Sequence, residues 1–197
     1  MTSLTEGRLR FDFPDDWRVE KFDELGFYRG RFLKLSSGAT ACEKCDARLR
    51  CGACKADRPD GAKGVDFLAV DASGGVGWLI EVKDYCNTLR TDLLFLADEV
   101  AAKVRNTLAC VVAMKRADDP RERDLAAATL RCDDYRVVLH LEEPPGTAAR
   151  RRVHPANSRL ANVQNKLQTR LAPVDRRAEA VGLSRPGGKA WSVTDIG

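Results

Sequence analysis

The chain has 197 residues, of which 44% are hydrophobic and 31% are charged. This is enough for one domain with a real core. No apolar run approaches the ~20 residues that a membrane span needs, and the first residues lack the basic start and apolar stretch of a signal peptide. From these features we expect the protein to be cytoplasmic.

The charge is unevenly distributed along the chain. The net charge is +4, but the segment from Ala148 to Gly197 holds ten Lys or Arg residues against three acids, a net of +7. The first 147 residues therefore carry a net charge of −3. Such a basic segment can offer a phosphate-binding surface, and the alternative is an ordinary solvated face rich in arginine.

The N-terminal part predicts one helix. Residues 1–20 look irregular or extended. Asp23 is a plausible N-cap for a helix that runs to about Leu35, because apolar residues recur there at helical spacing. Gly26 and Gly30 weaken this prediction, because glycine lowers the stability of helices.

The middle of the chain predicts a strand hairpin. Residues 36–63 form a break rich in Ser, Gly, Ala and Cys. Two strand-like runs follow at 64–71 and 76–85, and Ser73-Gly74-Gly75 between them suits a tight turn. The first run is apolar on both faces, as in a central strand that is covered on both sides.

The remaining elements alternate between helix and strand. Together they predict a mixed α/β domain with helices packed on a small sheet. The expected elements are a helix at 89–115, a short helix at 120–130, a strand at 135–143, a helix at 157–172 with a basic side, and a short strand near 190–193.

Three polar residues stand out on the apolar hairpin. Glu81 and Lys83 are two positions apart, so they point to the same face of their strand. With a turn centred near residue 74, Asp66 on the first strand comes close to opposite Glu81. Two carboxylates and an ammonium group then converge on one patch of the sheet. The alternative is an edge strand on which Glu81 and Lys83 form a surface ion pair.

This patch suits metal-assisted cleavage of a phosphodiester bond. Mg²⁺ prefers oxygen ligands and usually takes one or two carboxylates while keeping several waters. Asp66 and Glu81 can supply them, helped by the main-chain carbonyl of Val82. A bound metal would activate water and neutralise phosphate charge, and Lys83 could orient that water or stabilise the transition state.

Gly64-Val65-Asp66 followed by Ile80-Glu81-Val82-Lys83 resembles the signature of the PD-(D/E)xK nuclease superfamily. The resemblance covers roughly two-thirds of the chain. It implies a restriction-endonuclease-like core, in which a central mixed sheet is flanked by helices. It also implies that Asp66 and Glu81 bind Mg²⁺ or Mn²⁺ and that Lys83 is catalytic. Val65 stands where the family usually has proline.

The resemblance suggests further site residues. Many members of the superfamily add an acid from the first helix, and Glu20, Asp23 and Glu24 are the candidates here. Many also carry a basic residue or glutamine on the helix after the lysine. Lys103 or Arg105 could serve, although Lys103 is equally placed for a surface pair four residues from Glu99.

Four cysteines within thirteen residues form a second motif. Paired CxxC units are a strong metal signal, because each can turn two thiolates toward one ion. We expect Zn²⁺ in a compact knuckle inserted at residues 40–58, and an iron–sulfur cluster is the alternative. The cysteines are Cys42, Cys45, Cys51 and Cys54.

The sequence therefore predicts a single nuclease-like domain over 1–197, with the cysteine knuckle as an insert and 148–197 as a basic helical extension. The expected activity is Mg²⁺-dependent cleavage of DNA in defence, restriction or repair. The alternative is an inactive nuclease-like subunit that binds nucleic acid or a partner protein. The substrate form, a larger protein complex and a homodimer are left open.

Overall fold

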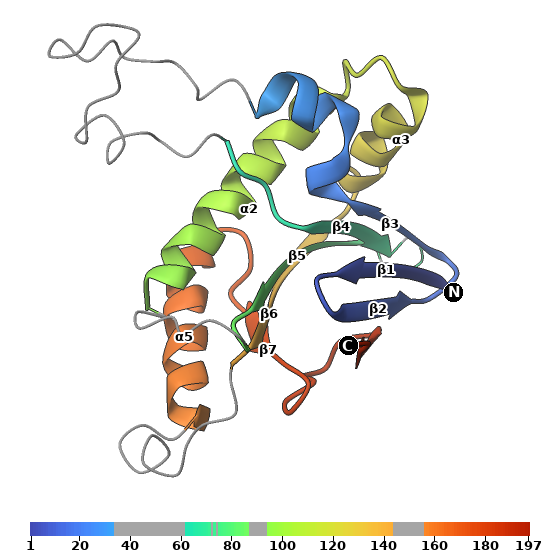
Figure 1. The fold of residues 1–197 in the computed structure, drawn as a ribbon. Coiled ribbons are helices and arrows are strands. Elements are labelled where there is room, and N and C mark those ends of the chain that lie inside the picture. The colour runs from blue at the N-terminus through green and yellow to red at the C-terminus, as the bar shows by residue number, and fades with distance from the viewer. Residues whose placement is uncertain (34–61, 72, 74, 87–93, 144–155) are drawn as a thin grey trace, which may run out of the picture.

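In the computed structural model, the described parts of the chain form two β-sheets and a layer of helices (Figure 1). The described residues are 1–33, 62–71, 73, 75–86, 94–143 and 156–197. Within them, no helix is both long and apolar enough to cross a membrane. The cysteine knuckle expected at 40–58 lies outside the described residues.

The central sheet has five strands in the order β3-β4-β5-β6-β7. Strands β3, β4 and β5 form an antiparallel meander, and β6 and β7 then run parallel to β5. The sheet is therefore mixed, as the sequence predicts. The strands are β3 (Trp17–Lys21), β4 (Phe67–Asp71), β5 (Val76–Asp84), β6 (Asp134–Glu142) and β7 (Glu179–Val181).

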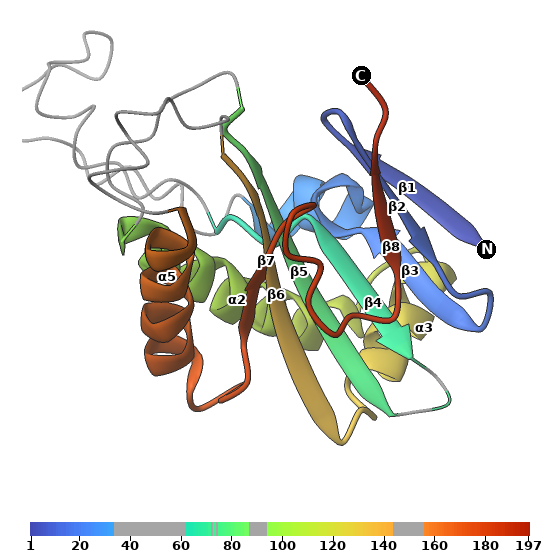
Figure 2. The same cartoon turned by 90° about the horizontal axis from the view of Figure 1, so that it is seen from below.

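A smaller antiparallel sheet covers one face of the central sheet (Figure 2). It contains β1 (Thr2–Glu6), β2 (Leu9–Phe13) and β8 (Ser192–Asp195) in that order, so N-terminal and C-terminal segments contribute adjacent strands of the same sheet. An aromatic-rich core fills the space between the two sheets. Its buried members include Phe11, Phe13, Trp17, Phe67 and Trp191.

The helices cover the other face of the central sheet (Figure 1). They are α2 (Leu94–Met114), α3 (Pro120–Thr129) and α5 (Ala156–Leu171). All three were expected within a few residues of these bounds. Apolar side chains of α2 and α5 pack on those of β4, β5 and β6, so the central sheet is buried on both faces.

The single helix expected from Asp23 to Leu35 is wrong. The described part of this segment forms a 3-10 turn, η1 (Phe22–Glu24), and a π-helical turn, η2 (Tyr28–Phe32). The N-cap of η1 is Lys21, and it makes no side-chain capping bond. The break falls at Leu25, whose backbone is extended, and Gly26 and Phe27 are helical and lead into η2.

Residues 1–20 form strands β1, β2 and β3, where the sequence indicated only irregular or extended chain. The basic C-terminal segment contains strands as well as the expected helix. Strand β7 is at one edge of the central sheet, and β8 pairs with β2 in the small sheet.

Candidate active site on strands β4 and β5

Strands β4 and β5 pair in the register that the sequence predicts. Phe67 lies opposite Ile80, and the Asp66 amide just before β4 donates a hydrogen bond to the Ile80 carbonyl over 3.1 Å. Asp66 therefore lies next to Glu81, as a turn centred near residue 74 requires. The hairpin alone is sufficient to bring the two carboxylates together.

The side chain of Asp66 is held by the neighbouring strand. Its Oδ2 accepts a hydrogen bond from the Val82 amide over 2.7 Å, and its own carbonyl accepts one from the Phe22 amide over 2.8 Å. The side chain is 13% exposed. The hydrogen bond from Val82 holds Oδ2 of Asp66 against β5. The other carboxylate oxygen, Oδ1, faces Lys103.

The two residues before Asp66 are anchored by buried hydroxyl groups. The Gly64 amide donates to the Tyr28 hydroxyl, and the Val65 amide donates to the Thr107 hydroxyl, each over 2.9 Å. A Cβ at Gly64 would lie 2.6 Å from the Phe22 ring. The start of β4 is thus locked between η1, η2 and α2, and the position of Asp66 depends on all three.

Glu81 is the most unusual residue of the site, because its carboxylate has no exposed surface. Oε1 contacts the ammonium groups of Lys83 at 2.5 Å and Lys103 at 2.6 Å, whereas the buried Oε2 has no hydrogen-bond partner in the part of the chain that the structure describes. Burial, and then the negative charge of Asp66, raise the pKa of Glu81 against the opposing effect of the two lysines.

The two lysines reach the site from different elements. Lys83 lies on β5 and Lys103 on α2, and the Lys103 Nζ is also 3.7 Å from Asp66 Oδ1. Burial lowers the pKa of Lys83, but the charge and hydrogen bond of Glu81, together with Asp66, outweigh burial and raise it. The resemblance named Lys103 as one of two candidates, and the structure places it against Glu81.

Asp23 is a third carboxylate near the site. Burial raises its pKa, and the charges of Glu6 and Asp66 raise it further. Its Oδ1 is buried and has no hydrogen-bond partner among the described residues. The other two upstream candidates have different surroundings. Glu24 pairs with Lys21 at 3.2 Å, and Glu20 interacts mainly with charges on α3 and β3.

The two site carboxylates face a position that a cation can occupy, because Lys103 contacts both of them. Over the described residues, no three or more His, Cys, Asp or Glu side chains are grouped to hold a metal ion. A divalent metal at Asp66 and Glu81 would therefore need further oxygen ligands from main chain or water, which is usual for Mg²⁺. The four knuckle cysteines lie outside the described residues.

The basic side of α5 is partly neutralised by α2. Lys166 and Arg170 both bind Asp98, at 2.7 and 2.6 Å. The positive charge that the sequence places along this helix is thus not all available to a phosphate. The Arg159 side chain, which shares that side in the sequence, lies outside the described residues.

Comparison with known proteins gives one relative. Over 174 residues the chain is 33% identical to a cysteine–tRNA ligase of Neisseria meningitidis serogroup A. The match covers 83% of this chain but 24% of the ligase, so the chain spans about a quarter of the length of that curated relative. No family model and no solved structure matches the chain.

Proposed function

We propose that this chain is a Mg²⁺- or Mn²⁺-dependent nuclease. Its active site, formed by Asp66, Glu81 and Lys83, cleaves phosphodiester bonds. The observation that carries the proposal is the burial of Glu81 beside Asp66, with one ammonium group contacting both carboxylates. Burying two carboxylates so close together is costly, and a cation-binding role gives a reason for this arrangement.

The order of the elements supports a restriction-endonuclease-like core. An antiparallel meander β3-β4-β5 is followed by α2 and by β6, which is parallel to β5. The PD-(D/E)xK resemblance implies the same succession of a meander, a helix and a further strand. Asp66 lies just before β4, and Glu81 and Lys83 lie on β5, in the part of the meander where the resemblance expects them.

Asp66 and Glu81 would hold the metal, which when bound supplies charge neutralisation at the phosphate and an activated water. Asp66 is oriented for this by the Val82 amide on its Oδ2. Glu81 offers Oε2, which has no partner within the described residues. Asp23 adds negative charge nearby and favours a cation at the same place.

Lys83 is proposed to stabilise negative charge instead of removing a proton. Its raised pKa keeps the ammonium group charged at neutral pH, so it does not act as a general base. An ammonium group beside the scissile phosphate would stabilise the charge that develops in the transition state. Lys103 is a positioning residue that balances the charge of Glu81.

The knuckle of Cys42, Cys45, Cys51 and Cys54 is proposed to bind Zn²⁺, with an iron–sulfur cluster as the alternative. The proposed substrate is DNA, as the resemblance suggests. RNA is the second candidate substrate, because the relative is named as a tRNA ligase. Both substrates present the same phosphodiester group to the site.

The proposal is tested by incubating the full chain with linear, circular and single-stranded DNA and with RNA, with and without Mg²⁺ or Mn²⁺. We expect wild type to cut and Lys83→Ala and Asp66→Ala to be silent while still folded. The matched controls are Lys115→Ala and Asp16→Ala, at exposed positions, which should cut like wild type. Cleavage by the site variants would contradict the proposal.

A second candidate is a subunit that binds nucleic acid or a partner protein without cutting. The favouring observation is that Lys83 and Lys103 already balance the charge of Glu81. In that case wild type would bind a nucleic-acid strand or a partner protein but leave the strand intact with every metal, as Lys83→Ala would.

A further inference from the structure

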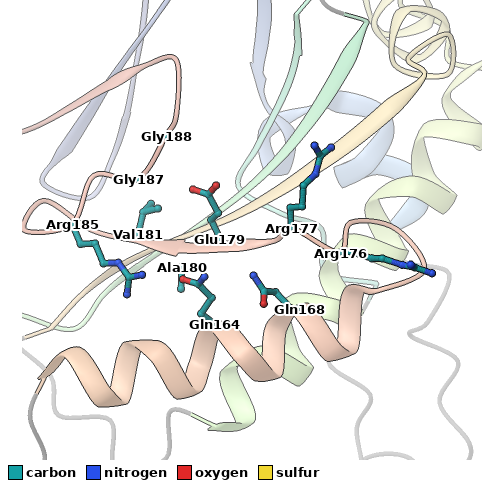
Figure 3. A pocket seen from close by; sticks show the side chains of 10 residues that line it. All are labelled: Gln164, Gln168, Arg176, Arg177, Glu179, Ala180, Val181, Arg185, Gly187 and Gly188. Carbon is teal, nitrogen blue, oxygen red and sulfur yellow. The ribbon is translucent and has the colours of Figure 1, made fainter.

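A pocket lies between α5 and the edge strand β7, away from the candidate active site (Figure 3). Its volume is about 390 Å³, within the range of small-molecule sites and too small for a folded partner. Strand β7 is paired on one side with β6, and its other edge forms the pocket wall. The lining combines arginines, glutamines and two consecutive glycines.

The pocket carries positive charge that the described residues do not neutralise. Of its three arginines, Arg177 binds Asp134, while the single acid, Glu179, lies 3.6 Å from Arg136. Arg176 and Arg185 are exposed and form no ion pair with a described residue. Two guanidinium groups are thus available for an anion.

These two arginines are at opposite ends of the pocket. Arg185 extends toward α5 beside Gly187, and Arg176 lies at the other end, in the segment that joins α5 to β7, with its side chain pointing outward from that rim (Figure 3). Two separated guanidinium groups suit a chain of phosphates better than one small anion. The two guanidinium groups are separated along the length of β7, and this arrangement favours an extended ligand.

Amide groups lie between the two arginines. Gln164 and Gln168 rise from α5 toward β7 (Figure 3). Gln168 uses its Nε2 to donate to the Ala178 carbonyl over 3.1 Å, so its oxygen stays available as an acceptor. Glutamine side chains between basic groups can read the polar edge of an unpaired base.

The pocket lies level with Glu81 along the central sheet. Glu81 on β5 is in register with Leu139 on β6, and Leu139 is in register with Ala180 on β7. Two strand spacings of about 4.8 Å separate Ala180 from Glu81, roughly 10 Å in all. The two sites therefore lie on neighbouring parts of the same sheet.

We propose that the pocket between α5 and β7 binds an unpaired segment of a single nucleic-acid strand, with Arg176 and Arg185 on phosphates at the two ends of that segment and Gln164 on a base between them. The identity of this strand as the substrate of the Asp66–Glu81 site rests on the proposed function. The binding itself does not depend on cleavage.

The test is fluorescence anisotropy of a labelled 20-nucleotide single strand, as RNA and as DNA, with the full chain and no added divalent metal. Arg176→Gln with Arg185→Gln should weaken binding about tenfold and reduce the salt-dependence slope by about 1.4, because each single-strand phosphate contact contributes about 0.7. The charge-matched control is Arg18→Gln with Arg116→Gln, of which Arg18 lies on β3 at the opposite sheet edge. The control should bind like wild type.

The uncharged side of the pocket has its own test. Gln164→Ala should weaken strand binding several-fold without changing the salt slope, whereas Asn165→Ala, at the neighbouring exposed position of α5, should have no effect. A duplex should bind with the same affinity to wild type and to the arginine variant. Preference between the RNA and DNA strands identifies the source of the ligand.

Two results would overturn the inference: equal losses of affinity for the pocket and control variants, or an equal loss for duplex and single strand. Failure of the nuclease proposal is a separate result. If the chain binds the strand through Arg176 and Arg185 but cuts nothing, the binding pocket is supported and the nuclease proposal is contradicted.

Discussion

Replacing Lys103 by methionine removes one of the two ammonium groups on the buried Glu81 carboxylate and keeps a long apolar side chain. Removing one partner of a buried ion pair typically costs about 3–5 kcal/mol. Lys83 still contacts the same oxygen at 2.5 Å. We therefore expect a smaller loss in unfolding free energy, about 2–3 kcal/mol, because half of the compensation remains.

The loss should depend on pH, because Glu81 titrates. Burial and the charge of Asp66 raise the pKa of Glu81 in the folded state above the ordinary value of 4.5 that it has in the unfolded chain. Between the unfolded-state pKa and the folded-state pKa, the folded protein therefore binds more protons than the unfolded chain. In that window the unfolding free energy falls as pH rises. Without Lys103 the pKa rises further, so the cost of Lys103→Met should be largest near pH 8 and shrink toward pH 5.

Urea unfolding at pH 5, 6.5 and 8 measures this cost, and thermal unfolding should show a drop of about 5–10 °C at neutral pH. Lys115→Met, at an exposed position just after α2, is the control and should change little. Adding Glu81→Gln to Lys103→Met should recover more than half of the lost stability. A cost below about 0.5 kcal/mol, independent of pH, would refute the buried ion cluster, since it would match an ordinary surface substitution.

Three further predictions concern stability and metal. Gly64→Ala should lower the unfolding free energy by about 1–3 kcal/mol, because its Cβ meets a buried ring, whereas Gly30→Ala, where a Cβ meets nothing within 4 Å, should not destabilise. Asp119→Ala should cost about 1 kcal/mol in urea unfolding by removing the N-cap of α3, and Asp119→Asn should keep most of that stability. Elemental analysis should find one zinc per chain, lost in Cys51→Ser and kept in Cys132→Ser; iron with visible absorption would favour the cluster instead.

Local patterns predicted much of the central sheet and its helices. The turn at 73–75 determines the pairing of β4 with β5, and that pairing places Asp66 beside Glu81. Period-two alternation puts Glu81 and Lys83 on one face. The C-terminal end of α2 and the bounds of α3 and β6 follow from apolar periodicity and from the Asp119 cap.

The prediction was weaker where local signals were ambiguous. The segment 23–33 has helical spacing of apolar residues, but it forms separate 3-10 and π turns, since packing of Tyr28 and Phe22 around the start of β4 decides its path. Strand β7 has only three residues, too few for a periodic pattern, and it forms because β6 offers a free edge.

The sequence by itself determined that an acid and an ExK motif would meet on a hairpin, because turn position and alternation are properties of neighbouring residues. Only the tertiary structure decided which distant groups join them. Lys103 comes from α2 and Asp23 from η1, and their approach to Asp66 and Glu81 depends on how these elements pack on the sheet. The α5–β7 pocket has the same origin, because its arginines and glutamines converge only when β7 joins the sheet beside α5.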